Sequence, residues 1–323
     1  MDSLQSIEKP CIGIVDCGTN TFNLLVAEHD KGVWKVLFSN KVPVKVGEGG
    51  FERNSITDNK IVRAVDVLCH YQLVCQLFHV QKVKVVATSA IRDAKNNHQL
   101  VEMIRKYVGW DMEIISGDEE AGLIYQGILE TGVLKEKTSL MMDIGGGSTE
   151  FIIGNAKNIF WKKSYPLGVS RLFEKIQPEE RLSAANIKQL KMILDNELHD
   201  LRAALLLFPC EELIGASGSF DTLLDIFIAA ADEVVGNQNA LYQAIPLSAF
   251  PAIHLWLMGS TMKERLSHPA IPTLRAEYLP LSSWMVKYII ELSNVKFMYR
   301  SAYALKEGLL QKELNIQHLR IGS

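Results

Sequence analysis

The chain has 323 residues, of which 48% are hydrophobic and 22% are charged, a balance that excludes an intrinsically disordered protein. This length allows about two domains. The net charge of −3 excludes a general attraction to nucleic acid or to a membrane surface, so a polyanionic substrate would need a local group of basic side chains. Residues 1–9 lack the layout of a signal peptide, and no apolar stretch approaches the roughly 20 residues of a membrane span. We therefore expect a cytoplasmic protein.

Two hairpins with the same pattern stand out along the chain. The first begins with a strand, Cys11–Val15, that ends at Asp16, continues through the polar turn of residues 17–21 and resumes as a strand over 22–26. The second has a strand over 140–142, the run Asp-Ile-Gly-Gly-Gly-Ser-Thr-Glu over 143–150, and a strand over 151–153. One hairpin alone would be weak evidence. The pair predicts two duplicated lobes.

Between the hairpins, helices and strands alternate, which places the first lobe in the α/β class. We expect, in this order, a helix over 58–79 capped by Asp58, a strand over 83–87, a helix over 97–108 and a strand over 112–115. The segment Ser116-Gly117-Asp118 then opens a helix that begins at Glu119.

After the second hairpin, the pattern predicts a strand over 158–164 and one long helix over 184–206, capped by Ser183. A strand over 213–214 then enters a third glycine-rich turn, Gly215–Ser219, which precedes a helix to residue 231. Prolines divide the next region into short helical pieces, and helices near 283–292 and 302–314 finish the chain. We expect one lobe over 1–128, to which a helix over about 302–323 returns, and a second lobe over 129–301.

The glycine turns favour anion binding. Gly145, Gly146 and Gly147 let the backbone direct its N–H groups around an anion without obstruction from side chains. Hydroxyl groups accompany the turns at Thr19, Thr21, Ser148 and Thr149. The P-loop order Gly-x-x-x-x-Gly-Lys-Ser/Thr and the Rossmann fingerprint are both absent, which excludes those two nucleotide sites. A tight hairpin selected for geometry alone would explain one such turn, but three together favour phosphate binding.

Charged residues flank these turns. Asp16, Asp143 and Glu150 are candidate metal ligands, because oxygen ligands beside a phosphate site are what Mg²⁺ requires. The alternative is that the aspartates only cap their turns. Arg92, just past a strand end, is a candidate for a bidentate phosphate contact, and a surface arginine is the alternative. Glu120 lies in the first turn of a helix, where a carboxylate also favours the helix dipole without any further function.

Four segments, in this order and at this spacing, resemble the exopolyphosphatase and guanosine pentaphosphate phosphohydrolase (Ppx/GppA) family: residues 16–21, 87–94, 117–121 and 143–150. Later segments support the resemblance over essentially the whole chain: Gly215–Ser219, residues 275–277 and residues 304–310. The first segment is shared across the actin-like ATPase superfamily, but the combination is specific.

The resemblance implies an α/β fold of two ribonuclease-H-like lobes, in the short two-domain form, with the active site in the cleft between them. Glu120 matches the catalytic carboxylate that orients or deprotonates the attacking water, and Arg92 matches a phosphate-contacting arginine. Asp143 and Glu150 match the acidic residues linked to a divalent cation, Mg²⁺ or another, and Asp16 stays a candidate metal ligand from its position at the first turn. Gly145, Gly146, Gly147 and Ser148 match the loop around the terminal phosphate. Together with the other glycine turns, the predicted phosphate-binding residues are Gly18, Thr19, Asn20, Thr21, Gly145, Gly146, Gly147, Ser148, Thr149, Gly215, Ser217 and Gly218.

The resemblance implies Mg²⁺-dependent release of terminal orthophosphate from inorganic polyphosphate. Longer relatives carry a further C-terminal helical region that helps to hold long polyphosphate, so we expect a preference for short chains. Lys45 stands where many relatives have arginine, which weakens a bidentate phosphate contact. Hydrolysis of guanosine pentaphosphate, phosphate transfer to a nucleotide, and a non-catalytic regulator are the alternatives. No nucleic acid or membrane partner is expected, and a homodimer is left open.

Overall fold

A computed structural model describes residues 9–30, 33–231 and 240–321, with side chains described up to Glu313. The chain divides into two compact units, Met1–Ile115 and Ser116–Ser323, and each is described by itself. The helix over 117–130 belongs to the second unit, and the lobe limits 1–128 and 129–301 stay predictions. Residues 1–8, on which the signal-peptide expectation depends, lie outside the described residues.

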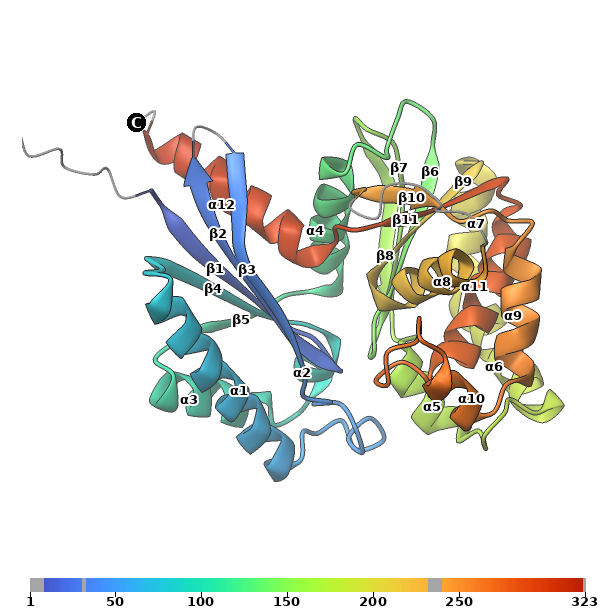
Figure 1. Cartoon of the computed structure of the whole chain (residues 1–323), viewed down its shortest axis with the longest axis horizontal. Coiled ribbons are helices and arrows are strands. Elements are labelled where there is room, and N and C mark those ends of the chain that lie inside the picture. The colour runs from blue at the N-terminus through green and yellow to red at the C-terminus, as the bar shows by residue number, and fades with distance from the viewer. Residues whose placement is uncertain (1–8, 31–32, 232–239, 322–323) are drawn as a thin grey trace, which may run out of the picture. The chain divides into compact units, whose positions relative to one another are not determined.

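The first unit is built on a five-stranded sheet with the order β3-β2-β1-β4-β5 (Figure 1). The strands are β1 (Cys11–Cys17), β2 (Thr21–Asp30), β3 (Val33–Pro43), β4 (Lys82–Ala87) and β5 (Met112–Ile114). The first three are antiparallel neighbours, and β4 and β5 run parallel to β1. Helices α1 (Asp58–Leu77) and α3 (Asn97–Tyr107) bury their apolar residues against one face of this sheet, and α2 (Ser89–Asp93) follows β4.

The second unit repeats this topology. Its six-stranded sheet has the order β10-β11-β9-β6-β7-β8. The strands are β6 (Ser139–Ile144), β7 (Thr149–Gly154), β8 (Ile159–Tyr165), β9 (Glu212–Ala216), β10 (Tyr242–Ala244) and β11 (Phe297–Ser301). Read from β8, the order and directions of β8-β7-β6-β9-β11 match those of β3-β2-β1-β4-β5. This repeat confirms the prediction of two ribonuclease-H-like α/β lobes.

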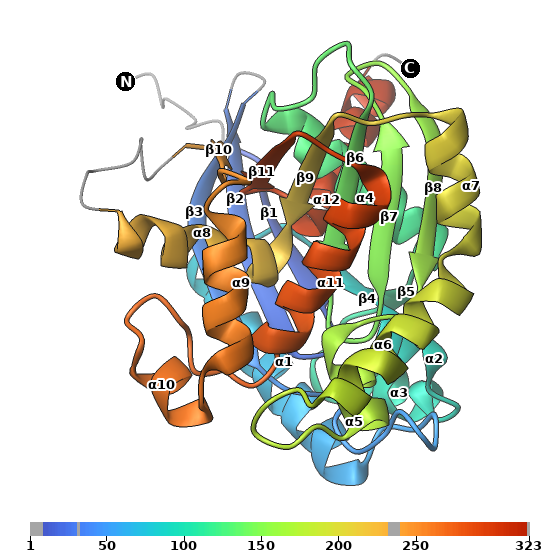
Figure 2. The same cartoon turned by 90° about the vertical axis from the view of Figure 1, so that its right-hand side faces the viewer.

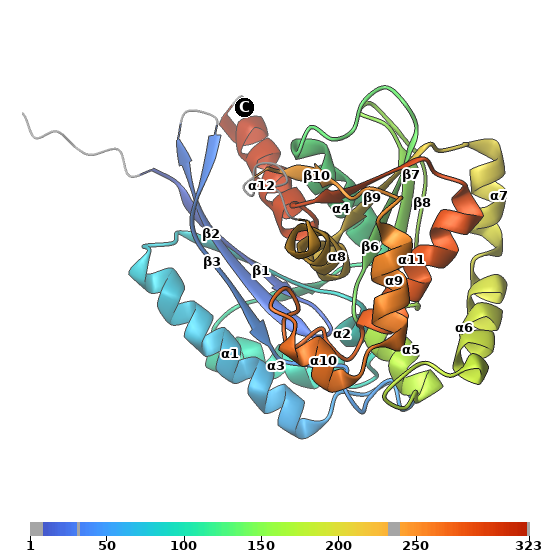
Figure 3. The same cartoon turned by 45° about the vertical axis from the view of Figure 1, so that its right-hand side comes forward.

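Helices cover both faces of the second sheet. Helix α4 (Gly117–Glu130) packs on β7 and β8, and α12 (Leu305–Ile321) packs on α4. The larger core lies on the opposite face. Figures 2 and 3 show helices α8, α9 and α11 on that side of the sheet. The helices outside the α4 layer are α5 (Val169–Ile176), α6 (Ala184–Glu197), α7 (His199–Leu207), α8 (Ser217–Ala230), α9 (Phe250–Gly259), α10 (Met262–Ser267) and α11 (Leu279–Ser293).

Two glycines bring α12 into close contact with α4. A Cβ atom at Gly127 would lie 1.9 Å from the carbonyl oxygen of Ala304, and one at Gly308 would lie 1.9 Å from that of Leu123. Backbone therefore meets backbone where the two helices cross. The return of the C-terminal helix to the first lobe stays a prediction.

The structure corrects several expected elements. Thr57, not Asp58, is the N-cap of α1. The long helix expected over 184–206 is two helices that meet at Leu198, whose ψ of 21° leaves the helical region. The apolar positions continue across this break, so the hydrophobic pattern conceals it. The segment Gly215–Ser219 is not a free turn, because α8 already begins at Ser217. Strands β3, β10 and β11 were not expected.

Among the helices of the described residues, none is both long enough and apolar enough to cross a bilayer.

Candidate active site

The glycine loop between β6 and β7 directs its carbonyl groups toward α5. The backbone N–H groups of α5 residues donate to the oxygens of Gly145 and Gly146, at 3.0 Å from Val169 and 2.9 Å from Ser170. The Nε of Arg171 donates to the oxygen of Gly147 at 2.8 Å.

The same contacts fix the direction of the loop amides. In a trans peptide the N–H points opposite to the C=O of the preceding residue. The N–H groups of Gly146, Gly147 and Ser148 therefore point away from α5, and successive amides with a shared direction form an anion-binding nest. Among the described residues, the amides of Gly146 and Gly147 have no protein acceptor. This arrangement of amides is suited to an anion, and phosphate binding by the loop stays a prediction.

Gly168, which the sequence analysis did not single out, lies directly against this loop. A Cβ atom at Gly168 would be 2.3 Å from the carbonyl carbon of Gly146 and 2.3 Å from the nitrogen of Gly147. Any larger residue would therefore displace the loop or α5. The Leu167-Gly168 pair after β8 carried no recognisable signal in the sequence.

The turn in the first unit has the same local structure. Gly18 N donates to Thr21 O at 3.1 Å, as Gly145 N donates to Ser148 O at 3.0 Å. The carbonyls of the turn again accept from a later segment: Thr19 O from the amide of Gly47, and Asn20 O from the amides of Val44 and Lys45. The side chain of Lys45 is paired with Glu48 at 3.1 Å. The repeat predicted from the two hairpins therefore extends to the hydrogen bonds of the turns.

Three buried carboxylates converge beside the glycine loop of the second unit. Leu140, Met142 and Ile144 of β6 enter the larger core, so Asp143 faces the opposite side, toward α4. Glu150 of β7 is the direct partner of Asp143 in the antiparallel register and shares its face. The first turn of α4 supplies Glu120 to the same neighbourhood. Glu120, Asp143 and Glu150 are 6%, 5% and 1% exposed.

Both neighbouring carboxylates affect the pKa of Glu150. Burial raises this pKa well above its usual value, and the negative charges of Glu120 and then Asp143 raise it further. Hydrogen bonds from Ser164 and Ser148 act in the opposite direction, and Ser164 Oγ donates to Glu150 Oε1 at 2.7 Å. The cluster therefore carries an excess of negative charge that a cation would relieve.

The buried carboxylates fit Mg²⁺ that is bound by one or two side chains and completed by other ligands. In the part of the chain that the structure describes, no three His, Cys, Asp or Glu side chains are arranged to hold a metal ion by themselves. Mg²⁺ usually binds through one or two carboxylates and completes its shell with water and substrate phosphates. Asp143 and Glu150 are suitable for that mode.

Two of the hydroxyl groups predicted to bind phosphate form hydrogen bonds within the protein. Thr149 Oγ1 donates to the carbonyl of Leu167 at 2.9 Å, which ties β7 to the segment before α5. Ser148 bonds to the Glu150 carboxyl. Their phosphate contacts stay predictions.

Asp16 and Arg92 occupy positions in the first unit. Asp16 faces away from the core that Val15 and Cys17 enter, and its Oδ2 accepts a 2.9 Å hydrogen bond from Asn23. Arg92, in α2, donates through Nη1 to the carbonyl of Ile115 at 3.2 Å, with its Nε 3.7 Å from Asp93. The roles predicted for both residues stay predictions.

The third glycine segment serves close packing. A Cβ atom at Gly215 would lie 1.9 Å from the ring of Phe220, and one at Gly218 would lie 2.4 Å from the guanidinium of Arg275. Ser217, between them, has a φ of 66°. Phosphate binding by Gly215, Ser217 and Gly218 stays a prediction.

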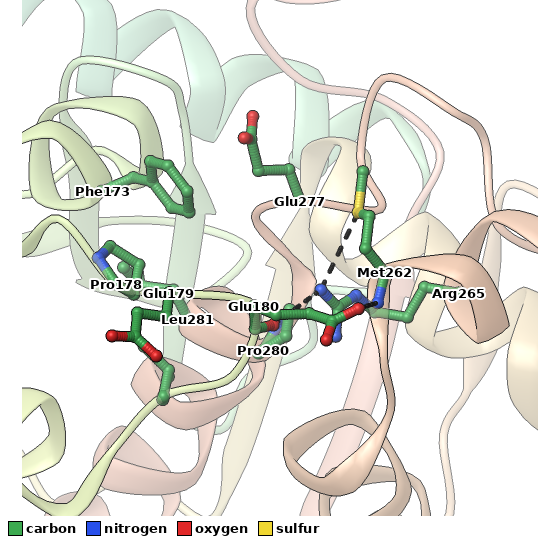
Figure 4. Close-up of a pocket in the computed structure, with 10 residues that line it drawn as sticks. Phe173, Pro178, Glu179, Glu180, Met262, Arg265, Glu277, Pro280 and Leu281 are labelled. Atoms are coloured by element: carbon green, nitrogen blue, oxygen red, sulfur yellow. Dashed lines mark hydrogen bonds between the residues drawn. The ribbon is translucent and has the colours of Figure 1, made fainter.

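A cavity of about 400 Å³ in the second unit is lined by residues outside the predicted site (Figure 4). Arg265 at its wall is 2% exposed, and its guanidinium donates to the carbonyls of Ala276, Ser260 and Glu180. Glutamates also line the cavity, at positions 179, 180 and 277. These carboxylates make it unfavourable for a polyphosphate.

The repeated topology and the carboxylate-flanked glycine loop define a two-unit protein of the actin-like, ribonuclease-H-like class. The chain belongs to the Ppx/GppA phosphatase family, whose model matches residues 25–317.

Three relatives illustrate the similarity. A crystal structure of an exopolyphosphatase from Cytophaga hutchinsonii is 32% identical, with a TM-score of 0.91 over 94% of this chain and 98% of that one. The Ppx/GppA family member of Aquifex aeolicus is 21% identical, with a TM-score of 0.79 over 95% of this chain and 98% of that one, which shows the fold. The guanosine-5'-triphosphate,3'-diphosphate pyrophosphatase of Vibrio cholerae is 27% identical over 98% of this chain. The chain spans 61% of the length of that protein.

Proposed function

We propose that the protein hydrolyses a terminal phosphoanhydride bond and releases orthophosphate from inorganic polyphosphate, with a preference for short chains. The observation that carries this proposal is the convergence of Glu120 with Asp143 and Glu150 beside the amides of the glycine loop. Phosphoanhydride hydrolysis needs a positioned water and neutralised phosphate charge more than a covalent nucleophile.

Each group has a proposed part in that reaction. The loop amides hold the terminal phosphate, and Glu120 orients the water and accepts its proton. The water oxygen bonds to the terminal phosphorus while the bond to the bridging oxygen breaks, and the shortened chain leaves as an anion. Asp143 or Glu150, together with phosphate oxygens, would hold Mg²⁺, which when bound would supply positive charge to the transition state. Arg92 and Asp16 of the first unit are proposed to contact phosphate and the metal ion.

Guanosine pentaphosphate is the second candidate substrate, because the similarity to the Vibrio cholerae pyrophosphatase extends over 98% of the chain. The 5'-triphosphate end of that nucleotide offers the same terminal phosphoanhydride as polyphosphate.

The two substrates are distinguished by orthophosphate release at matched concentrations in the presence of Mg²⁺. We expect the larger kcat/KM for short polyphosphate. Release from guanosine pentaphosphate alone would reject polyphosphate as the substrate. Transfer of the phosphate to an added nucleoside diphosphate instead of water would reject hydrolysis.

A further inference from the structure

The first turn of α4 carries three consecutive carboxylates whose surroundings differ. The side chains of Asp118 and Glu119 are 71% and 35% exposed, and each pairs with a lysine. Glu120 is only 6% exposed and faces Glu150. Two carboxylates therefore connect this turn to other elements, and the third enters the candidate site.

Lys162 of β8 makes the first of these connections. Its Nζ donates to the carbonyl oxygen of Asp118 at 2.6 Å and to the Asp118 carboxylate at 2.8 Å. A Cβ atom at Gly122 would lie 3.4 Å from the same Nζ, so the ammonium group lies across the first turn of α4. The second connection is Lys312 of α12, whose Nζ is 2.7 Å from Glu119.

The register of β8 explains how one strand contacts both Glu150 and the helical turn that carries Glu120. Ser164 is the partner of Glu150, and Lys162 is the partner of Ile152. Residues two apart on a strand share a face, so both side chains point toward α4. Ser164 then bonds to Glu150, and Lys162 bonds to the turn that carries Glu120. Lys163 points to the opposite face, where it pairs with Asp200 of α7.

We propose that Lys162 is a positioning residue for Glu120. Its two bonds to Asp118 hold the start of α4 against β8, and β8 is bonded through Ser164 to Glu150. The spacing between Glu120 and Glu150 is thereby set by one strand. Lys162 also places a positive charge beside a turn with three negative ones. This inference rests on the proposed role of Glu120 in hydrolysis.

The test combines Lys162→Met with Glu120→Gln, and kcat and KM are measured for short polyphosphate. We expect Lys162→Met to lower kcat by roughly 10- to 100-fold, because small misplacements of a reacting group are costly, with KM changed less than about twofold. In the Glu120→Gln background, Lys162→Met should have no further effect on kcat. Lys162→Arg should restore much of the rate, because a guanidinium can still donate to Asp118.

Lys163→Met is the matched control, since it removes a lysine–aspartate pair from the same strand on the opposite face. We expect its kcat to stay within about twofold of the wild type, because that pair does not contact α4. If thermal unfolding shows that Lys162→Met does not fold, Asp118→Asn takes its place, because it weakens the same contact. We expect kcat to fall in Asp118→Asn by less than in Lys162→Met. An unchanged kcat in Lys162→Met, or in Asp118→Asn where that variant decides, would overturn the inference.

The remaining outcomes separate the two proposals. A raised KM with unchanged kcat, or an undiminished effect in the Glu120→Gln background, would mean that Lys162 contacts the substrate directly and would reject the positioning role. Wild-type turnover in Glu120→Gln alone would instead reject the proposed function.

Discussion

Asp143 of β6 and Glu150 of β7 are direct partners across an antiparallel strand pair, and both are nearly fully buried. Two like charges in this arrangement repel each other strongly unless a proton or a cation balances them. The loop between them is the glycine loop that directs its amides away from α5. One hairpin therefore combines an anion-binding backbone with carboxylates suited to a cation.

The first prediction concerns the stability of the hairpin. The pKa of Glu150 is raised in the folded protein, so ionisation of this group opposes folding. The protonated Glu150 carboxyl group contributes fully to stability below the pKa of the unfolded chain, near 4.5. This contribution is lost as the pH rises through the pKa of the folded protein. Glu150→Gln should therefore raise the free energy of unfolding at pH 8 by about 1 kcal/mol or more, and the gain should vanish near pH 4.

Urea unfolding at several pH values, with a chelator present to remove divalent cations, measures this difference. Glu102→Gln, at an exposed position of α3, is the control and should show little change. A gain for Glu150→Gln that is equal at pH 4 and pH 8 would contradict the electrostatic account.

Gly168→Ala should lower turnover more than it lowers stability. The added methyl group meets the peptide between Gly146 and Gly147 and moves the loop amides, for which we expect a fall in kcat/KM of about 10- to 100-fold. Gly259→Ala, where no atom lies within 4 Å of the new Cβ, is the matched control. Steady-state kinetics of both variants measures the effect. Equal kinetics for the two would show that the loop does not depend on this contact.

Gly308→Ala, in contrast, should lower stability more than it lowers turnover. Its new methyl group would lie 1.9 Å from the carbonyl oxygen of Leu123, so α12 must move away from α4. We expect a loss of about 1–3 kcal/mol in the free energy of unfolding, which chemical denaturation measures. An unchanged unfolding midpoint would show that the crossing of α4 and α12 tolerates a wider spacing.

Arg92→Lys tests the predicted phosphate contact of the first unit. Lysine keeps the charge but not the planar pair of donors, so we expect KM for polyphosphate to rise by about tenfold. Arg105→Lys, on the exposed side of α3, should leave KM unchanged. A normal KM in Arg92→Lys would remove Arg92 from the proposed site.

Local chemistry made much of this structure predictable. The two hairpins were clear because each joins short apolar strands through a glycine-containing polar turn. Ser183 is an N-cap as expected and accepts a hydrogen bond from a backbone N–H of its helix. Ser116 lies in the segment expected to open a helix, and it is the N-cap of α4, which begins at Gly117 rather than at Glu119. The duplicated topology then followed from the repeat.

The missed features depend on tertiary contacts. Strand β3 is largely exposed and mixes polar with apolar residues, so its pairing with β2 supplies what its own pattern does not. Gly168 has no signature apart from the backbone that it meets. Lys162 is one of many lysines until the register of β8 directs it toward α4.

Orthophosphate release by Glu120→Gln is the most direct test of the central claim that Glu120 activates the water. With short polyphosphate and saturating Mg²⁺, we predict that kcat falls by about 10²- to 10⁴-fold, the usual contribution of a general base. Polyphosphate binding should be retained, because the glutamine keeps the size of the side chain. Wild-type kcat in the folded variant would contradict the account.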